Sequence, residues 1–320
     1  MRILLTGSSG WLGRFLAPML REEGHEVVGL DVAPGTDTQV IGSVADRALI
    51  DRTFAERGIQ AVIHGGALHK PDIARHPRQA FVDVNVTGTL NLLEAAVAAG
   101  HDRLVFTSTT SLMISAAVRA GTGDRAVWLD ETAAPLEPRN IYGVTKLAAE
   151  HLCRLHHLEH GLACVVLRTG RFFPEEDDTH RELSGLNRKA NEFLNRRLTV
   201  EDAARAHVVA LKRAPSIGFG TYLISAPTPF TRSDAAELKR DAPAVIARYF
   251  PDAQGLYARA GWQLPETIER VYDAGLAARE LGFRCDTDFS AVLQAMRAGL
   301  RMPFQHDPSY VSPKNMENTG

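Results

Sequence analysis

The sequence predicts an α/β fold with a doubly wound parallel sheet and a small C-terminal substrate-binding region. Short apolar segments with strand character alternate with helical patterns over residues 1–225. A glycine-rich turn directly follows the first of these strands, and small or hydroxyl-bearing residues follow two later ones. Alternation of this kind is typical of a parallel sheet covered by helices, in which ligands bind where the strands end.

The first strand and the turn after it form the best-defined motif. An apolar run occupies Ile3–Leu5, and a helical pattern after the turn ends near Gly24. The turn supplies the first candidate cofactor-binding residues, Gly7, Ser9, Gly10, Trp11, Leu12 and Gly13. Glycines in such a turn allow a tight bend, close approach of the backbone to a pyrophosphate and close packing of helix on strand, while the helix N-terminus attracts the phosphates. The order of strand, glycine turn and helix predicts a dinucleotide site.

Asp31 ends the second predicted strand, His25–Leu30, at the expected interval of about twenty residues from the glycine turn. A carboxylate at that place can accept hydrogen bonds from the adenosine ribose. It would repel a 2′-phosphate, and residues 32–40 contain no Arg or Lys to attract one. NAD is therefore favoured over NADP. The alternative is an ordinary βαβ unit whose glycines serve only as turns.

Composition and charge exclude several classes of protein. The chain has 320 residues, of which 45% are apolar, and its 36 Lys and Arg against 38 Asp and Glu give a net charge of −2. This balance gives no reason to expect a nucleic-acid or membrane partner, and no apolar run is long enough for a membrane span. The N-terminus lacks the pattern of a signal peptide. Cys153, Cys164 and Cys285 lack metal-ligand spacing, so buried or incidental thiols in a cytoplasmic protein are expected.

The rest of the chain divides into three parts. A Rossmann-type core is expected over residues 1–170, a mainly substrate-binding region over 171–302 and a tail over 303–320. Further strands are expected within 40–46 and at 60–64, 103–107, 163–167 and 220–225, the last returning to the core. Helices are expected at 45–57, 77–100, 141–158 and 198–214, with an irregular stretch at 121–140 and mostly helical structure over 227–300.

Three features near strand ends are further candidates. Gly65-Gly66-Ala67 follows a strand, where it allows backbone to approach a ligand or forms a simple turn. A hydroxyl cluster at Thr107–Ser111 follows another strand, which makes it a catalytic candidate as well as ordinary loop chemistry. Asn85 lies inside a helical pattern. An exposed side chain is the default expectation there, and a buried one that braces the neighbouring strand is the alternative.

Tyr142 and Lys146 are four residues apart on a predicted helix, so both side chains lie on one face. A tyrosine is a poor base at neutral pH, but an adjacent ammonium and the positive ring of NAD⁺ both favour the phenolate and lower the pKa of the tyrosine. Thr109 can share a hydrogen bond with the same substrate oxygen. With the dinucleotide motif, this trio predicts hydride transfer at a carbinol carbon. Taken alone, the four-residue spacing of Tyr142 and Lys146 also fits a surface tyrosine that packs over the aliphatic part of the lysine side chain.

Two polar segments have plainer explanations. Four histidines crowd one predicted helix, but without a third ligand at suitable spacing no metal site is expected, and surface histidines are favoured: His151, His156, His157 and His160. Residues 175–197 are strongly charged, which is typical of solvated surface or of a mobile segment that covers a substrate.

These motifs, taken in order, resemble the extended short-chain dehydrogenase/reductases, the NAD-dependent epimerase/dehydratase group. The resemblance covers about residues 1–225 and rests on the following segments: TGSSGWLG at 6–13, Asp31, NVTGTLNLLEAA from Asn85, FTST at 106–109 and YGVTK at 142–146. It implies that Tyr142 is the base, Lys146 its activator and a ribose ligand, and Thr109 the hydroxyl partner. It also implies homodimers that pair through the helices carrying Asn85 and Tyr142.

The resemblance extends the set of expected site residues. The glycine turn and Asp31 would bind NAD together with residues from later elements: Val44 (or Asp46) near the adenine, Gly66, Ala67, Asn85, Tyr142 and Lys146. Expected substrate contacts are Thr109, Thr110 and Arg171.

Several departures from the family pattern bear on the substrate. Ser43 replaces a usual Asp, and the turn at 171–174 reads RFFP. The chain from that turn to Leu198 is short, which leaves little to hold a nucleoside diphosphate. These departures favour a smaller, sugar or sugar-acid substrate over a nucleotide sugar. Arg171 suits an anionic or polyhydroxylated ligand, or equally forms a salt bridge to the acidic run at 175–178.

Three functional hypotheses follow. The first is a dehydrogenase that releases NADH. The second is an epimerase that returns the hydride to the opposite face, and the third is a non-catalytic NAD-binding regulator, which would not need the Thr109, Tyr142 and Lys146 set. A dehydratase is disfavoured because no acidic residue follows Thr109.

Overall fold

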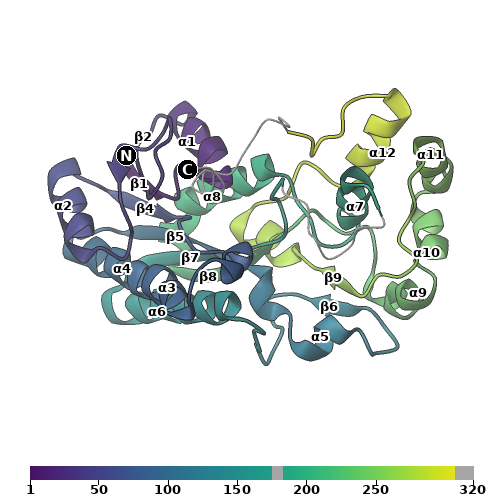
Figure 1. Cartoon of the computed structure of the whole chain (residues 1–320), viewed down its shortest axis with the longest axis horizontal. Helices are drawn as coiled ribbons and strands as arrows, with labels where there is room; N and C mark the ends of the chain where they lie inside the picture. The colour runs from purple at the N-terminus through teal and green to yellow at the C-terminus, as the bar shows by residue number, and fades with distance from the viewer. Residues whose placement is uncertain (175–182, 307–320) are drawn as a thin grey trace.

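A seven-stranded parallel sheet forms the core of the computed structural model, which describes residues 1–174 and 183–306 (Figure 1). Its strands run in the order β3-β2-β1-β4-β5-β7-β8. Their bounds are β1 Arg2–Thr6, β2 Glu26–Asp31, β3 Val40–Ile41, β4 Ala61–His64, β5 Arg103–Thr109, β7 Ala163–Thr169 and β8 Phe219–Ile224. Every neighbouring pair in the sheet is parallel. The predicted doubly wound α/β fold is confirmed.

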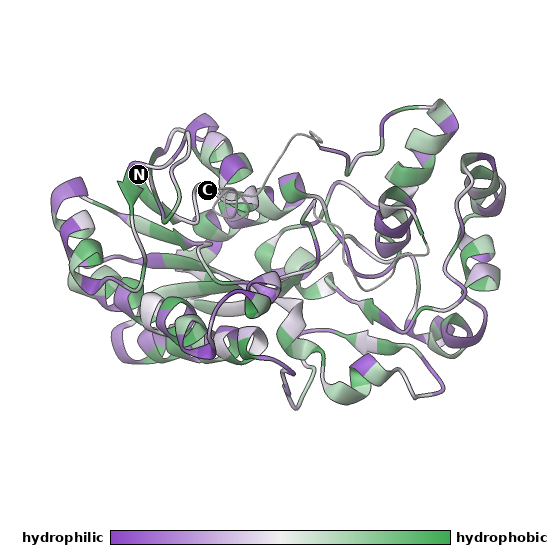
Figure 2. Cartoon of the chain, in the orientation of Figure 1, coloured by the Kyte–Doolittle hydropathy of each residue, from purple (hydrophilic) through white to green (hydrophobic). Residues whose placement is uncertain are grey.

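Helices cover both faces of this sheet because its strands are apolar on both sides. On one face, Ile3 and Leu5 of β1 belong to a buried cluster with α1 (Trp11–Glu22) and α8 (Val200–Ile217). On the other, Leu4 belongs to a cluster with α2 (Arg47–Arg57), α4 (Gly88–Ala98) and α6 (Ile141–His160). The hydropathy colouring shows the strands as a green layer between helices with purple outer faces (Figure 2).

The helix expected at 77–100 has an interruption. It consists of α3 (Arg78–Phe81), a π-helical turn at Val82–Thr87 and α4. A π-helical turn widens the helix by one residue, and such turns are frequent at functional sites. This one contains Asn85, whose side chain is buried.

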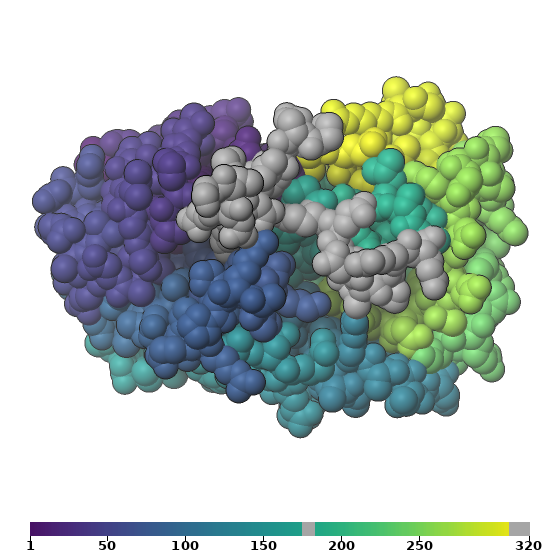
Figure 3. All heavy atoms as spheres, in the orientation of Figure 1, coloured from purple at the N-terminus to yellow at the C-terminus, as the bar shows by residue number. Residues whose placement is uncertain are grey.

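The C-terminal region has its own small core. Its helices are α7 Gly185–Glu192, α9 Ala235–Arg240, α10 Ala242–Tyr249, α11 Ala253–Ala260 and α12 Phe289–Ala298. The short helix α5 (Ala116–Ala120) follows β5 and has no buried residue. A two-stranded parallel sheet joins β6 (Val127–Leu129) to β9 (Arg270–Tyr272). The expectation of an irregular stretch at 121–140 was therefore wrong at β6. In the space-filling view, purple and blue core residues lie on one side of the molecule and green and yellow C-terminal residues on the other (Figure 3).

The structure describes only part of the charged segment and of the tail. Within the segment expected at 175–197, residues 175–182 lie outside the described residues, while the remainder contains the ordered helix α7. Of the tail expected at 303–320, residues 307–320 also lie outside them. Among the described residues, no helix is both long enough and apolar enough to cross a membrane.

Candidate active site

The glycine turn between β1 and α1 has the shape that a dinucleotide requires. Gly7 has a φ of +77°, and a Cβ there would lie 2.8 Å from the amide nitrogen of Gly66. A Cβ on Gly13 would lie 2.3 Å from the carbonyl oxygen of Gly7. Gly10 is the N-cap of α1 and has no side chain to cap that helix N-terminus. Larger residues would close this cradle, so the turn fits the pyrophosphate of NAD.

Asp31 lies beside the turn, as the sequence predicts. Its carboxylate accepts hydrogen bonds from the backbone amides of Ser9 and Ala33, each at 3.1 Å. The Ser9 hydroxyl donates to the carbonyl oxygen of Ala33 at 2.7 Å. These bonds hold the acid at the carboxyl end of β2 next to the cradle, which is the arrangement that suits a ribose diol.

The loop after β4 forms a floor next to the glycine turn. The Gly66 amide donates to the Thr6 hydroxyl at 3.0 Å. Asn85 braces this loop because its Oδ1 accepts from the Leu68 amide at 2.8 Å and its Nδ2 donates to the Leu68 carbonyl at 3.1 Å. Its Nδ2 also lies 3.0 Å from the Thr145 hydroxyl oxygen of α6. The default expectation of an exposed Asn85 was wrong, and the alternative of a buried, bracing amide is closer to the structure.

Two residues expected near the adenine have clear structural contacts. Val44 is buried and packs on α4, where a Cβ at Gly88 would lie 2.5 Å from its Cγ2. Asp46 is the N-cap of α2, and its carboxylate accepts from the Leu49 amide at 3.0 Å. Contact of either residue with a cofactor stays a prediction.

Thr109, Tyr142 and Lys146 are brought together at the carboxyl end of β5 and the start of α6. Thr109 is the last residue of β5, and Tyr142 and Lys146 lie one turn apart at the start of α6. Burial raises the pKa of Tyr142 to about 12, an effect that the neighbouring Thr109 side chain opposes. The predicted lowering of this pKa is therefore not a property of the protein alone, because desolvation of the phenolate exceeds the favourable contacts.

Lys146 is buried on the same helix face. Its ammonium lies 4.2 Å from the centre of the Phe106 ring, a cation–π contact. Burial lowers the pKa of Lys146 to about 7, while Glu150 acts in the opposite direction. The lysine therefore changes charge near neutral pH unless a ligand favours its charged form.

Three polar residues near this trio were not identified from the sequence, namely Glu150, Arg168 and His69, whereas Ser108 belongs to the hydroxyl cluster that was. Glu150 accepts from the Ser108 hydroxyl at 2.5 Å and pairs with Arg168 at 2.7 Å, and all three side chains are buried. The His69 ring lies 5.8 Å from the Tyr142 ring, centroid to centroid. A signal was available for Arg168, because it is a charged residue at the end of the apolar run of β7.

Thr110 and Arg171, expected to contact substrate, already have protein partners. The Thr110 side chain is buried, and its hydroxyl donates to the Thr169 carbonyl at 3.3 Å. Arg171 pairs with Glu192 of α7 at 3.2 Å. The acidic run at 175–178, its other expected partner, lies outside the described residues.

Glu192 is the centre of a cluster of basic side chains. It pairs with Arg196 and Arg197 at 2.9 and 2.8 Å as well as with Arg171. Burial alone would raise the pKa of Glu192, but the three guanidinium groups together lower it to about 2. The cluster joins the end of β7 to the C-terminal region.

The histidines of α6 are not all at the surface. His151 and His160 are exposed, whereas His156 is buried with its Nδ1 2.9 Å from the Leu152 carbonyl, so the expectation of a surface position was wrong for it. No group of three metal-binding side chains occurs within residues 1–174 and 183–306. All three cysteines are buried and free.

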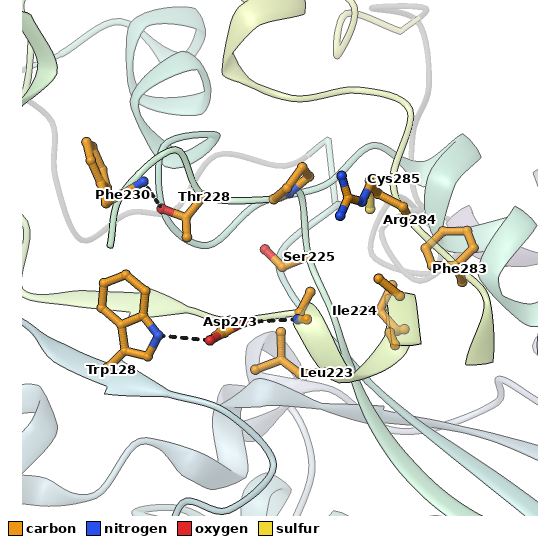
Figure 4. Close-up of a pocket in the computed structure, with 15 residues that line it drawn as sticks. Trp128, Leu223, Ile224, Ser225, Thr228, Phe230, Asp273, Phe283, Arg284 and Cys285 are labelled. Atoms are coloured by element: carbon orange, nitrogen blue, oxygen red, sulfur yellow. Dashed lines mark hydrogen bonds between the residues drawn. The ribbon is translucent and has the colours of Figure 1, made fainter. Parts of the chain in front are cut away.

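A separate cavity of about 220 Å³ lies beyond the carboxyl end of β8. Trp128, Phe230 and Arg284 line it, and the Trp128 indole donates to Asp273 at 3.1 Å (Figure 4). Thr109, Tyr142 and Lys146 are not among its lining residues. The cavity is therefore distinct from the candidate catalytic trio.

Curated relatives match the first part of the chain. UDP-glucose 4-epimerase of Azospirillum brasilense is 31% identical over 176 residues, which are 52% of this chain and 48% of that protein. L-arabinose 1-dehydrogenase (NAD(P)(+)) of Haloferax volcanii is 33% identical over 175 residues, 53% of this chain and 66% of that protein. The chain spans about half the length of the first of these relatives.

Solved structures share the fold over nearly the whole chain. A short-chain dehydrogenase/reductase superfamily protein from Agrobacterium tumefaciens, solved with bound NAD, has a TM-score of 0.65 at 23% identity and covers 93% of this chain and 97% of its own. UDP-glucose 4-epimerase of Thermus thermophilus, in complex with NAD, has a TM-score of 0.62 at 23% identity and covers 94% and 100%.

A family model connects the fold, the cofactor and the class of protein. The model described as "NAD dependent epimerase/dehydratase family" matches residues 3–224, a range that begins in β1 and ends with β8. This range contains the glycine cradle, Asp31 and the Thr109, Tyr142 and Lys146 cluster. The cofactor is therefore NAD, the protein is an enzyme, and the resemblance to the extended short-chain dehydrogenase/reductases is confirmed. The chain belongs to the NAD-dependent epimerase/dehydratase family.

Proposed function

We propose that this enzyme transfers a hydride at a secondary alcohol of a sugar or sugar-acid substrate, with NAD as the cofactor. The observation that carries the proposal is the placement of Thr109, at the end of β5, by the start of α6, where Tyr142 and Lys146 are both buried and one helical turn apart. NAD⁺, when bound, supplies the hydride acceptor and a positive charge. The residues that would bind NAD come from the glycine turn, the segments at or after the ends of β2, β3 and β4, the π-helical turn and helix α6: Gly7, Ser9, Gly10, Trp11, Leu12, Gly13, Asp31, Val44, Gly66, Ala67, Asn85, Tyr142 and Lys146.

Each residue of the trio has a separate role in the proton transfer. Thr109 orients the substrate hydroxyl toward the Tyr142 oxygen by sharing a hydrogen bond with it. The Tyr142 phenolate takes the hydroxyl proton, and the Lys146 ammonium stabilises the phenolate. Because burial raises the pKa of Tyr142 to about 12 in the protein alone, the phenolate depends on positive charge brought close to it.

The second candidate is an epimerase, which returns the hydride to the opposite face of the same carbon. Sequence similarity favours it, since several relatives at about 30% identity are UDP-glucose 4-epimerases. The same trio serves both reactions because both begin with removal of a proton from an alcohol. A non-catalytic NAD-binding regulator is disfavoured by the complete trio.

Arg171 supports a substrate with a negative charge or several hydroxyl groups. Its side chain remains about one quarter exposed while it pairs with Glu192, and it follows the carboxyl end of β7, next to β5 in the sheet. We propose that Arg171 binds a substrate carboxylate or hydroxyl group, with Thr110 supporting the wall behind Thr109.

We also propose that the protein is a homodimer in the cytoplasm. Helix α6 exposes three apolar side chains in a stripe, Val144, Leu155 and Leu158. Such a stripe supports a homodimer that pairs through α6 and α4. The three buried free thiols support a cytoplasmic location.

The test measures NADH formation with NAD⁺, and then with NADP⁺, over a panel of free sugars, sugar acids and nucleotide sugars. A rise in reduced-cofactor absorbance with a free sugar or sugar acid supports the dehydrogenase. Chromatographic detection of a product isomer without net NADH supports the epimerase. Neither signal with any compound, from protein that binds NAD, contradicts the proposed function.

A further inference from the structure

His64 is a completely buried histidine next to the proposed cofactor site. It is the last residue of β4 and directly precedes Gly65, the start of the loop that forms the cofactor floor. Its ring touches Phe106, which also contacts the Lys146 ammonium. Burial and the nearby Lys146 lower the pKa of His64 to about 3, so the ring is neutral at physiological pH.

Both ring nitrogens of His64 have hydroxyl partners. Nδ1 lies 2.7 Å from the Thr6 hydroxyl oxygen, and Nε2 lies 3.0 Å from the Thr89 hydroxyl oxygen. A neutral imidazole carries one proton, so one nitrogen donates and the other accepts. The neighbouring bonds decide which nitrogen has each role.

The direction of every bond follows from the two hydroxyl groups. Thr89 donates its only hydroxyl proton to the Asn85 carbonyl at 2.7 Å, so its oxygen must accept from Nε2 of His64. Nδ1 is then the acceptor, and Thr6 donates to it. The Thr6 oxygen in turn accepts from the Gly66 amide at 3.0 Å.

The result is one directed chain of hydrogen bonds. It runs from the Gly66 amide through Thr6, His64 and Thr89 to the carbonyl of Asn85. The Asn85 side chain extends the connection, since it braces Leu68 at the other end of the same loop and lies 3.0 Å from Thr145. Thr145 lies between Tyr142 and Lys146 on α6. The chain therefore joins the cofactor floor to the helix that carries the proposed base.

We propose that His64 is a positioning residue for NAD, which holds the Gly65–Leu68 loop in its binding conformation as the neutral tautomer protonated at Nε2. A phenylalanine has the ring but neither nitrogen, so it would leave the Thr6 hydroxyl without an acceptor. A glutamine is always neutral and carries an acceptor and a donor at a spacing close to that of the two imidazole nitrogens. Hydrogen bonding and ring volume can therefore be separated by two variants.

His207 is a matched control. It is also completely buried and neutral, with a pKa lowered to about 4 by burial, and it pairs with the Thr107 hydroxyl at 2.7 Å. Its Nδ1 lies 2.7 Å from the Ala203 carbonyl, so Nδ1 must donate and Nε2 must accept. The two histidines thus have opposite tautomers, and His207 has no bond to the loop at Gly65–Leu68 among the described residues.

The first test is the ¹⁵N spectrum of the two rings in the wild-type protein, assigned by comparison with His64→Gln and His207→Gln. His64 should show a protonated Nε2 and an unprotonated Nδ1, and His207 the reverse. The same tautomer for both rings, or a charged His64 at neutral pH, would overturn the proposal. This readout does not depend on substrate, cofactor or turnover.

The second test is the dissociation constant for NAD, measured by calorimetry on folded protein. His64→Phe should raise it about tenfold or more, since a buried hydrogen-bonding group loses its partner, whereas His64→Gln should stay close to wild type. His207→Phe should lose stability without weakening NAD binding. The proposal would be overturned if His64→Phe and His64→Gln lost the same amount of NAD affinity, or if His64→Phe and His207→Phe did. Unchanged NAD affinity in His64→Phe would also overturn it.

A third variant covers the case in which His64→Phe does not fold. Thr89→Val keeps the shape of the side chain but removes the acceptor for Nε2 and the donor to Asn85. It should weaken NAD binding in the same direction, and unchanged binding would overturn the proposal. The inference rests on the proposed placement of NAD over this loop, but not on the proposed reaction. If no compound of the substrate panel gave NADH or a product isomer, the proposed reaction would be contradicted, but these three measurements would still test the role of His64.

Discussion

Glu150 and Arg168 form an ion pair with 2.7 Å between Oε2 and Nη2, and both side chains are more than nine-tenths buried. Glu150 lies one helical turn after the proposed catalytic Lys146 on α6. Removal of the acidic charge leaves the guanidinium buried without a counter-charge. Glu150→Gln should therefore lower the free energy of unfolding by about 3–5 kcal/mol, measured by urea denaturation. Glu94→Gln is the control, because its pair with Arg47 is about half exposed and should change stability little. Similar losses in both variants would contradict this account.

Tyr142→Phe tests the proposed base. The variant keeps the ring but removes the atom that takes the proton, so kcat should fall by about two to four powers of ten, while the dissociation constant for NAD stays within a few-fold of wild type. Steady-state kinetics and calorimetry give the two numbers. Full activity in this variant would show that another group is the base.

Asp31→Asn tests the choice between NAD and NADP. The amide keeps the size of the side chain but removes the charge that repels a 2′-phosphate and that accepts from the ribose. The dissociation constant for NAD should rise by about tenfold to a hundredfold, as expected for loss of charged hydrogen bonds, and the preference for NAD over NADP should shrink. A preference that stays unchanged would show that other residues determine it.

Lys146 predicts a dependence of stability on pH. Burial lowers its pKa from 10.5 to about 7, so between these values the folded protein has a neutral lysine while the unfolded chain keeps the proton. The unfolded state then binds more protons, and this lysine makes stability rise with pH across the window. Urea unfolding of the NAD-free protein should show that rise from about pH 7 to about pH 10, and Lys146→Met should reduce it. Parallel pH profiles for the two proteins would contradict the shift.

Local chemistry made much of the fold and of the site predictable. The strands that became β1, β4, β5 and β7 are apolar runs with clear ends, because a buried parallel strand must be apolar on both faces. The glycine turn and Asp31 were found since their spacing is set by one βαβ unit. Tyr142 and Lys146 were paired because four residues make about one helical turn.

The remaining features depend on contacts between distant residues. Asn85 is buried because its amide meets Leu68 and Thr145, and no pattern within its own helix indicates those partners. Glu150 similarly looks like an exposed helix residue until β5 and β7 supply Ser108 and Arg168. The strand β6 is short and its partner β9 lies far along the chain, so neither had a local signal.

The pairing of β6 with β9 also has a consequence for synthesis on the ribosome. Val127–Leu129 is synthesised before helix α6, yet its partner Arg270–Tyr272 is synthesised only after every strand of the parallel sheet. The nascent chain must therefore keep the edge of β6 unpaired while most of the protein is made. We expect β6 to be the latest strand to find its neighbour, so a ribosome stalled before residue 270 would hold a chain whose C-terminal core is still open.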